Sequence, residues 1–406
     1  MSDETFSGYL DASATAPLRP EARTAMLAVW DAGPGNASSV HSFGHRARSV
    51  VDESRAALAA ALGVRPGEIV FTSGGTEANN LALIGAALAS PRGRHIVTTP
   101  LEHLSVLESC RFLERVHGFE VAFAPVNDRG RVTVGGVMSL VRPDTTLVSI
   151  GLANAEIGTV QPVAEIGAAL DERFAGSGTA GGGRPLLHTD AVQAAASLPV
   201  SLGALGWPGA GVDLMSVASH KFGGPQGVGA LVVCAGIPIE PLLHGGGQER
   251  GARSGTENVA GIAGFAAAVT ALHREGVGTR AVALAASRDA LVVRVADRVP
   301  GARLTGDPSE RLPGHASFVI DSVSGESVLV ALDASGFAVS SGSACAAGSD
   351  EPSPVLLAVG VPPELARTAI RFSLPAPLPV TLLDRLVEVV VREVGASVLP
   401  ARSERE

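Results

Sequence analysis

The chain has 406 residues, of which 46% are hydrophobic and 17% charged, as in a soluble globular protein of more than one domain. Its formal net charge of −9 argues against an intrinsic nucleic-acid or anionic-membrane surface. The three cysteines, Cys110, Cys234 and Cys345, lie too far apart for a CxxC-type metal site or a disulfide framework. We expect a cytoplasmic protein with reduced thiols, no targeting segment and no membrane span.

The first ninety residues predict two helices and then a phosphate-binding turn. The expected elements are a turn-rich entry over 11–20, a helix over 21–30, a polar loop over 33–44 and an amphipathic helix over 45–62. A strand over 68–71 then leads through Ser73-Gly74-Gly75-Thr76 into a helix over 77–87. Because orphan N–H groups and the helix dipole converge at such a turn, Gly75 and Thr76 can hold an anion. A tight strand-to-helix connection without a ligand is the alternative.

Alternating strands and helices follow. Strands are expected over 95–99, 121–124, 146–150 and 186–188, with a helix over 163–174. This alternation predicts a mostly parallel sheet with helices on both faces. His103 lies at a strand-to-helix junction on the same edge as the glycine turn, either as a functional residue or as a helix cap. The glycine-rich stretch 175–184 is typical of a flexible surface loop without chemistry.

Asp190 places a carboxylate at the end of a predicted strand, and Gln193 follows three residues later. About one helical turn separates the two side chains, so both can face the same ligand. A buried carboxylate here can keep a ring nitrogen of a bound ligand in its protonated form. The lysine described next makes such a ligand relevant. A helix N-cap is the alternative role for Asp190.

Lys221 is the only lysine in the chain. The other 30 of its 31 Lys and Arg residues are all arginine. It lies between strands expected over 214–218 and 229–233, next to the turn Phe222-Gly223-Gly224-Pro225. Arginine cannot replace a primary amine that loses its proton and attacks a carbonyl. The position suggests a Schiff base with pyridoxal phosphate (PLP), a cofactor that also requires a carboxylate and a phosphate cradle. A chance survivor of lysine-to-arginine replacement is the alternative.

The last third of the chain predicts a smaller α+β domain that begins near residue 261. Before it, the glycine- and arginine-rich loop 244–258 could complete a phosphate site, including one in a second subunit. The segment 338–354 lacks bulky apolar residues, so we expect a mobile loop whose thiol, Cys345, is available as a nucleophile. Arg371, within an apolar strand, suits a carboxylate; a structural ion pair is the alternative.

Nine segments, in order along the chain, resemble the cysteine desulfurases, which are fold type I PLP enzymes of aminotransferase class V. The segments are YLDASATAP, GNASSVHSFG, FTSGGTEANN, LEH, LLHTDAVQA, SHKFGGPQGVGAL, HGGGQERGARSGTENV, SSGSAC and IRFS, from Tyr9 to Ser373. The SSGSAC stretch followed by GSDEPS is similar to the branch with the long catalytic loop. The resemblance implies conversion of L-cysteine to L-alanine, with the sulfur passing to Cys345 as a persulfide and then to an acceptor protein.

The resemblance also implies a role for each matching residue and a homodimer. Lys221 would form the Schiff base and act as general base, Cys345 would attack the substrate sulfur, and Arg371 would bind the substrate carboxylate. The remaining cofactor contacts would be His103 stacked on the ring, Asp190 at the ring nitrogen, Gln193 at the ring oxygen, Gly75, Thr76 and His220 at the phosphate, and Thr256 at the phosphate of the other subunit. We expect a large PLP-binding domain over 16–262 and a small domain over 1–15 and 263–406, with no metal.

Three places depart from the family pattern, one of which, the stretch 375–379 (PAPLP) after the arginine strand, has no functional interpretation. Ala155 stands where the family has the second of two asparagines, so Asn154 is the candidate replacement. Ala218 stands at the family's phosphate serine, with Ser219 next to it. Another class V PLP enzyme, such as a selenocysteine lyase or an aminotransferase, and a non-catalytic phosphate- or nucleotide-binding module are the alternative functions. Iron–sulfur cluster assembly, tRNA thiolation, DNA modification and a biosynthetic pathway remain open destinations for the sulfur.

Overall fold

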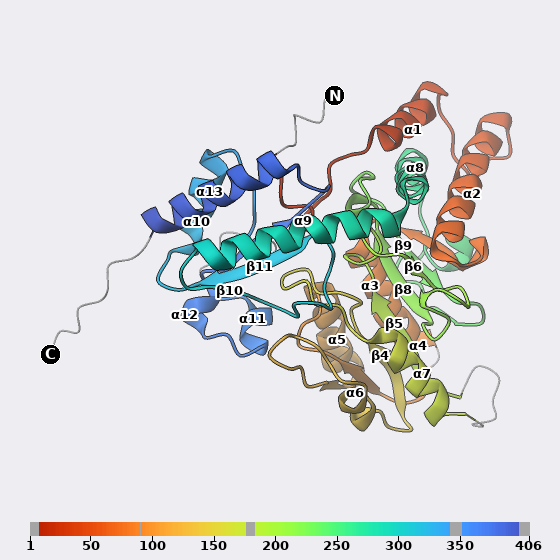
Figure 1. Cartoon of the computed structure of the whole chain (residues 1–406). Coiled ribbons are helices and arrows are strands. Elements are labelled where there is room, and N and C mark those ends of the chain that lie inside the picture. Colours follow the sequence, from red (N-terminus) through yellow and green to blue (C-terminus); the bar gives the residue numbers. More distant parts are fainter. Residues whose placement is uncertain (1–7, 90, 176–182, 342–350, 398–406) are drawn as a thin grey trace.

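The computed structural model describes residues 8–89, 91–175, 183–341 and 351–397. Their largest sheet has 7 strands in the order β1-β9-β8-β5-β4-β2-β3 (Figure 1). Strands β3, β2, β4, β5 and β8 run parallel, while β9 is antiparallel to β8 and β1. The strands are β1 Ile69–Thr72, β2 His95–Thr98, β3 Glu120–Phe123, β4 Thr145–Ser149, β5 Leu186–Asp190, β8 Leu214–Ala218 and β9 Gly229–Val233. The predicted mostly parallel sheet is confirmed.

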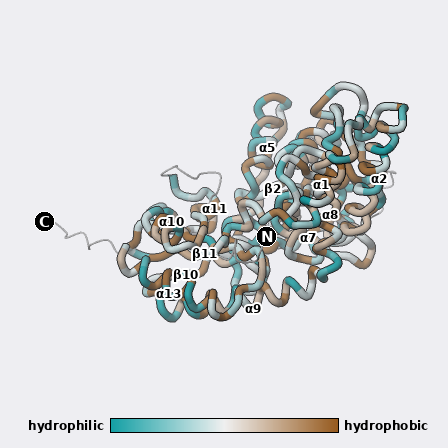
Figure 2. The backbone as a smooth tube through the Cα atoms, turned by 90° about the horizontal axis from the view of Figure 1, so that it is seen from above, coloured by the Kyte–Doolittle hydropathy of each residue, from teal (hydrophilic) through white to brown (hydrophobic). Residues whose placement is uncertain are grey.

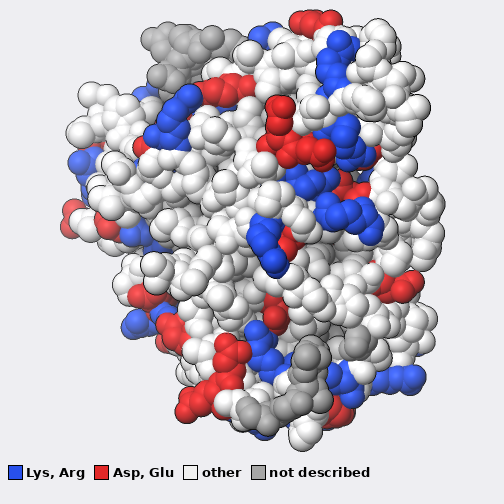
Figure 3. Space-filling model, turned by 90° about the vertical axis from the view of Figure 1, so that its right-hand side faces the viewer, with Lys and Arg blue, Asp and Glu red and all other residues white. Residues whose placement is uncertain are grey.

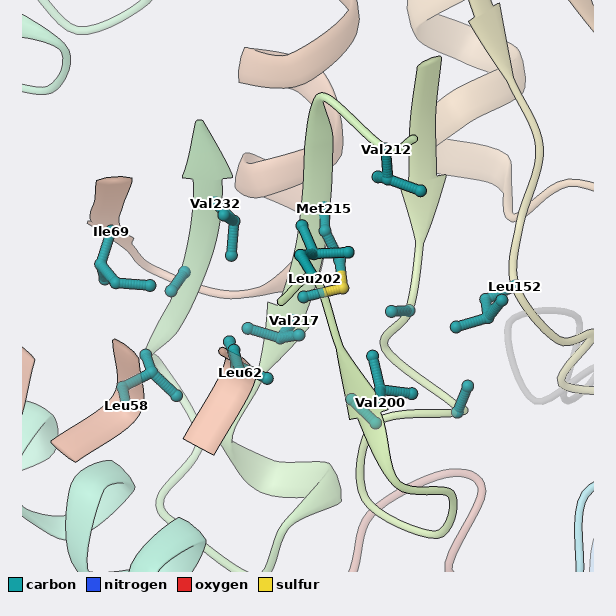
Figure 4. Close-up of a cluster of buried hydrophobic side chains, with 14 of the residues drawn as sticks. Leu58, Leu62, Ile69, Leu152, Val200, Leu202, Val212, Met215, Val217 and Val232 are labelled. Atoms are coloured by element: carbon teal, nitrogen blue, oxygen red, sulfur yellow. The ribbon is translucent and has the colours of Figure 1, made fainter. Parts of the chain in front are cut away.

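Helices cover both faces of this sheet because side chains alternate between its two faces along each strand. Val97 and Val148 face one apolar cluster, whereas their neighbours Ile96 and Leu147 face another. The first cluster includes α1 Pro20–Asp31, α2 Ser42–Leu62, α6 Val134–Leu140, α7 Val163–Arg173 and α8 Val259–Glu275. The second includes α3 Gly75–Asn80, α4 Ala86–Ala89 and α5 Leu104–His117. Figure 4 shows Leu58 and Leu62 of α2 close to the sheet residues of the first cluster.

A second group of elements is built on a 3-stranded antiparallel sheet, β10 Ala302–Leu304, β11 His315–Ile320 and β12 Ile370–Ser373. The helices around it are α9 Val277–Arg298, α10 Gly325–Ala334, α11 Pro354–Ala358, α12 Pro363–Ala366 and α13 Val380–Ala396. An apolar cluster of its own holds α9, α10 and α13 on this sheet. In Figure 2, α10, α11 and α13 lie to one side and α1, α2 and α5 to the other. The predicted smaller α+β part is therefore present, while its residue limits stay a prediction.

Two element boundaries differ from the sequence-based expectation. Helix α2 begins at Ser42, inside the predicted polar loop, because the side chain of His41 caps it by accepting from the Gly44 N–H at 3.2 Å. The helical run after the glycine turn begins at Gly75 and contains a π-helical segment over Leu81–Gly85 before α4. A minor two-stranded pairing joins β6 Val200–Ser201 to β7 Trp207–Pro208. Within the described ranges, no helix is long and apolar enough to cross a membrane.

Candidate active site

Lys221 lies at the end of the central sheet, one short 3₁₀ turn (Ser219–Lys221) after β8. Its Nζ donates to the carbonyl oxygens of Ser13 and Ala14, the latter at 2.9 Å. The carboxyl ends of parallel strands are where open α/β sheets bind their ligands. The lysine is therefore positioned as expected, but held by a segment that the sequence did not associate with it.

That segment, residues 11–15, crosses the site between the two sheets. Asp11 Oδ1 accepts from Arg371 Nη2 at 2.8 Å, and the Ser13 carbonyl accepts from Gln193 Nε2 at 3.0 Å. The Thr15 hydroxyl lies 3.2 Å from Nδ1 of His220. The sequence identifies this stretch as a turn-rich entry and as part of one of the nine family-like segments. It predicts none of these contacts, since most of them use backbone carbonyls. Its position next to β12 is fixed by the backbone bridge between Asp11 and Ser373.

A pocket at the glycine turn combines most of the predicted phosphate residues. It is lined by Ala14, Thr15, Ser73, Gly74, Gly75, Thr76, Glu77, His220, Gln226, Gly227 and Val228. A Cβ on Gly75 would lie 2.7 Å from Cγ2 of Val192, so only glycine fits there and the backbone stays open to a ligand. Burial, and then the charge of Lys221, lowers the pKa of His220 to about 4, so its ring is neutral at pH 7.

The directions in which Ala218 and its neighbour Ser219 point show whether a hydroxyl reaches the glycine turn. The methyl group of Ala218 lies 3.5 Å from the Cβ that Gly75 would carry, so it faces the glycine turn without a hydroxyl. Ser219 points elsewhere: its Oγ lies beside Gly224, is buried, and has no hydrogen-bond partner among the described residues. Ser219 therefore does not supply the hydroxyl that Ala218 lacks.

Asp190 and His103 face the same region from different elements. Asp190 ends β5, where its carboxylate accepts from Asn79 Nδ2 at 2.7 Å and from the Val192 N–H at 2.9 Å. His103 is the exposed N-cap of α5, and its Nδ1 accepts from the Ser105 N–H at 3.1 Å. Each residue therefore caps a helix or a turn, which is close to the alternative role considered for it, while its role towards a cofactor stays a prediction.

Behind Asp190 lies a layer of fully buried ionisable groups. Burial raises the pKa of Glu102 to about 7, against the lowering effect of hydrogen bonds from Gly151 and Thr99. Burial lowers the pKa of His188 to about 4, and its two ring nitrogens lie 2.9 and 3.1 Å from the hydroxyls of Ser149 and Ser216. The polar groups below the site are therefore hydrogen-bonded, as buried polar groups need to be.

Arg371 is buried on β12, where its Nη2 donates to Asp11 Oδ1 at 2.8 Å and its Nη1 donates to the carbonyl oxygen of Ala155 at 3.2 Å. His315 Nε2 lies 3.1 Å from the same carbonyl oxygen. Burial lowers the pKa of His315 well below its usual range, so this ring is neutral and donates through Nε2. Arg371 therefore has the structural ion pair considered from the sequence, at a position next to Ala155.

Two predicted residues are not joined to this group within the described chain. Cys345 lies outside the described residues, although the backbone of Ser340, shortly before it, pairs with Arg371 at 2.7 and 3.2 Å. Thr256 is exposed and does not line the phosphate pocket of its own chain. No cluster of three or more potential metal ligands occurs in the part of the chain that the structure describes.

Comparison with known proteins identifies the family. The model of the aminotransferase class-V family matches residues 8–378. The chain belongs to the class V aminotransferase family. A protein of Dictyoglomus turgidum named cysteine desulfurase IscS is 44% identical over 367 residues, 90% of this chain and 89% of that protein. A Cereibacter sphaeroides protein named cysteine desulfurase is 43% identical over 384 residues, 94% of each.

Solved structures agree with this class V assignment. A NifS-like protein superimposes with a TM-score of 0.85 at 34% identity, covering 96% of this chain and 99% of the other. The structure of SspA in complex with cysteine gives a TM-score of 0.76 at 31% identity, covering 92% and 100%. The predicted family, fold type and cofactor, PLP, are confirmed.

The residues of this class V enzyme fit PLP. Gly75 lines the pocket at the glycine turn, where its backbone can face a phosphate at the start of α3. The single lysine lies at the sheet edge that also carries the doubly hydrogen-bonded carboxylate of Asp190. These are the primary amine, the phosphate cradle and the anion that the cofactor requires.

Proposed function

We propose that this class V enzyme is a PLP-dependent cysteine desulfurase, which transfers the sulfur of L-cysteine to Cys345 and from there to an acceptor protein. The observation that carries the proposal is the only lysine, Lys221, at the strand end beside the glycine-turn pocket, in a chain whose relatives are named cysteine desulfurases. Glycine turns alone would also suit a simple phosphate-binding module, but such a module has no use for the lysine.

The bound cofactor supplies an electron sink for the pair released when the Cα proton of the substrate leaves. Lys221 would attach the cofactor and then act as the base that takes this proton. Asp190 would keep the ring nitrogen protonated, His103 would stack on the ring and Gln193 would contact the ring oxygen. Gly75, Thr76 and His220 would hold the phosphate. Each role is supported by the position of the residue around one sheet edge.

Arg371 would bind the substrate carboxylate through its forked guanidinium, next to the Asp11 carboxylate that already holds one side of it. The Cys345 thiolate then attacks the substrate sulfur. The Cβ–S bond breaks, an S–S bond forms, and the carbon keeps the electron pair and takes a proton. L-Cysteine and the Cys345 thiol thus become L-alanine and a Cys345 persulfide, with no external oxidant.

The homodimer and the contribution of Thr256 in trans belong to the same proposal. Thr256 is exposed at the start of α8 and outside the pocket of its own chain, which is the position expected for a residue that serves a partner. Mixing Lys221→Ala with Thr256→Ala chains tests this. One restored phosphate site per mixed dimer is expected, and a monomer in sedimentation would contradict it.

Replacement of Lys221 tests the cofactor attachment. Because the chain has no second lysine, reduction with borohydride should place the cofactor on Lys221 alone in the wild type and on no residue in Lys221→Ala. Peptide mass spectrometry reads out the adduct, and turnover should be lost as well. A reduced adduct elsewhere in the variant would overturn the assignment of Lys221.

Replacement of Cys345 separates a desulfurase from another class V enzyme. Cys345→Ser should still bind PLP and L-cysteine, since neither step needs a protein thiol, but it should form no persulfide and release no sulfide under reductant. Cys110→Ser is the matched control because that thiol is buried and burial raises its pKa to about 12. Alanine production at the wild-type rate in Cys345→Ser would indicate a lyase that expels sulfur without a protein nucleophile. Identification of the acceptor, with iron–sulfur scaffolds tested first, would define the pathway.

A further inference from the structure

Two buried side chains, Asn79 and Ser105, connect His103 to Asp190. His103 is the residue proposed to stack on the cofactor ring, and Asp190 is the one proposed to pair with the ring nitrogen. Asn79 on α3 and Ser105 on α5 are only 1% and 7% exposed. Asn79 Nδ2 lies 2.7 Å from Asp190 Oδ2 and 3.0 Å from Ser105 Oγ. Ser105 Oγ in turn lies 2.7 Å from His103 Nδ1. The four side chains therefore form one continuous chain of hydrogen bonds, from Asp190 to His103.

The direction of each bond follows from the groups involved. Asn79 Nδ2 has two hydrogens, one for the Asp190 carboxylate and one for Ser105 Oγ. The reversed amide would place its oxygen against the carboxylate, so the orientation is fixed. The amide oxygen of Asn79, Oδ1, is buried and has no hydrogen-bond partner among the described residues. The two bonds donated by Nδ2 are therefore what orients the Asn79 amide.

Because Ser105 Oγ accepts from Asn79, its own hydrogen is available to His103 Nδ1. The Ser105 backbone N–H donates to the same nitrogen at 3.1 Å. Two donors converging on Nδ1 leave no place for a hydrogen there, so the neutral imidazole carries its hydrogen on Nε2. The network thus determines both the orientation of the Asp190 carboxylate and the tautomer of His103.

We propose that Asn79 and Ser105 are positioning residues, which hold Asp190 as an acceptor for the ring nitrogen and His103 in its Nε2–H form. This inference rests on the proposed function for its catalytic meaning, but the two structural consequences can be measured without turnover. Loss of Asn79 affects both ends of the chain of bonds, whereas loss of Ser105 affects His103 directly and Asp190 only through Asn79.

The first measurement is the tautomer of His103 in the cofactor-free protein, from long-range ¹H–¹⁵N spectra of histidine-labelled samples. Comparison with His103→Gln identifies its signals among those of the 10 histidines. We expect the Nε2–H pattern in the wild type and a measurable Nδ1–H population in Ser105→Ala and Asn79→Leu. Ser105→Thr, which keeps a hydroxyl, should restore the wild-type pattern.

Ser109→Ala is the matched control. Ser109 lies one turn further along α5 and is also buried, and its hydroxyl donates to the Ser105 carbonyl at 2.7 Å. Its loss should leave the His103 pattern unchanged. An unaltered tautomer in both Ser105→Ala and Asn79→Leu, or an equal change in Ser109→Ala, would overturn the role of Ser105.

The second measurement is PLP affinity, by titration of the cofactor-free protein. Asn79→Leu removes one of two donors to a charged group, so the Kd should rise about ten- to hundredfold. Ser109→Ala should stay within threefold of the wild type. A Kd for Asn79→Leu within that same range would contradict the role of Asn79. A wild type that binds no PLP would instead refute the proposed function, and the tautomer comparison would still decide the role of Ser105.

Discussion

The side-chain amide of Asn154 is engaged by the backbone of its own loop and by the backbone of Leu101. Its Nδ2 donates to the Leu101 carbonyl at 2.8 Å, and its Oδ1 accepts from the Glu156 and Ile157 N–H groups. It therefore cannot replace the amide that Ala155 lacks, and Ala155 contributes only its carbonyl oxygen, to Arg371 and His315. The site has one polar side chain fewer than the family pattern implies.

Restoring this side chain should strengthen substrate binding. In Ala155→Asn, an added amide donor to the substrate carboxylate is worth roughly 1.5–3 kcal/mol, so the KM for L-cysteine should fall about ten- to hundredfold. The visible spectrum of the bound cofactor should remain nearly unchanged. A cysteine titration that follows alanine formation measures the effect.

Ala155→Leu serves as a control for a change of size without a donor, and it should not lower the KM. An unchanged or raised KM in Ala155→Asn would mean that another group already occupies this place.

At the scale of elements, the loop over 244–258 is held in place by one buried ion pair. Glu249 accepts from both terminal nitrogens of Arg55 on α2, at 2.6 and 2.7 Å, and from the Phe71 N–H at 3.0 Å. Glu249 and Arg250 both have positive φ angles, 47° and 56°, which non-glycine residues rarely adopt. The ion pair therefore stabilises a backbone conformation that costs free energy by itself.

Removal of this anion should destabilise the protein strongly. Glu249→Gln leaves Arg55, whose side chain is 6% exposed, buried without a counterion, so the free energy of unfolding should fall by about 3 kcal/mol. Urea denaturation measures the change. Glu21→Gln is the control, since its pair with Arg274 is exposed, with side-chain exposures of 40% and 72%, and should contribute under about 1 kcal/mol. Equal effects of the two substitutions would contradict this account.

At the scale of the whole molecule, opposite charges lie beside one another on the face shown in Figure 3, so this face has no extensive basic patch. The expectation from a net charge of −9, that the chain lacks an intrinsic nucleic-acid surface, stays a prediction. The ionisable groups that determine stability against pH lie inside the fold, where burial lowers the pKa of His188, His220 and His315.

These histidines predict a loss of stability in acid. Below pH 6.5 the unfolded chain binds protons on them that the folded chain does not, so the free energy of unfolding falls as the pH falls from 6.5 towards 4. Glu102 acts in the opposite sense, because its raised pKa of about 7 makes stability fall as the pH rises from 4.5 to 7. Burial also raises the pKa of the Glu156 and Asp213 carboxyls, and it lowers the pKa of His95 and His273. Five such histidines outnumber three such carboxyls, so the net change is a loss in acid.

His188→Gln isolates one of these contributions. With a pKa near 4 in the fold, His188 alone costs about 2 kcal/mol at pH 5 relative to pH 7. The difference between urea midpoints at the two pH values, measured on the cofactor-free protein, should therefore shrink in the variant.

The sequence by itself determined the succession of strands and helices, the mostly parallel sheet, the lysine at a strand end and the phosphate turn. These features depend on periodicity, on turn residues and on residue types, all of which are local. Lys221 could be singled out because it is unique, and Gly75 because it lies between a predicted strand and a predicted helix, where a phosphate-binding turn was one of two interpretations.

Only the tertiary structure decided which side chains meet. The carbonyl groups of Ser13 and Ala14 reach Lys221 across more than two hundred residues of sequence, and backbone carbonyls carry no sequence signal. Asn79 belongs to a motif that was noticed, yet its bonds to Ser105 and Asp190 exist because α3, α5 and β5 pack together. The sequence likewise did not determine where the side chains of Asn154 and Ser219 point, because packing decides which partners lie within hydrogen-bond distance. Asn154 turns to the Leu101 carbonyl, whereas Ser219 Oγ has no hydrogen-bond partner among the described residues.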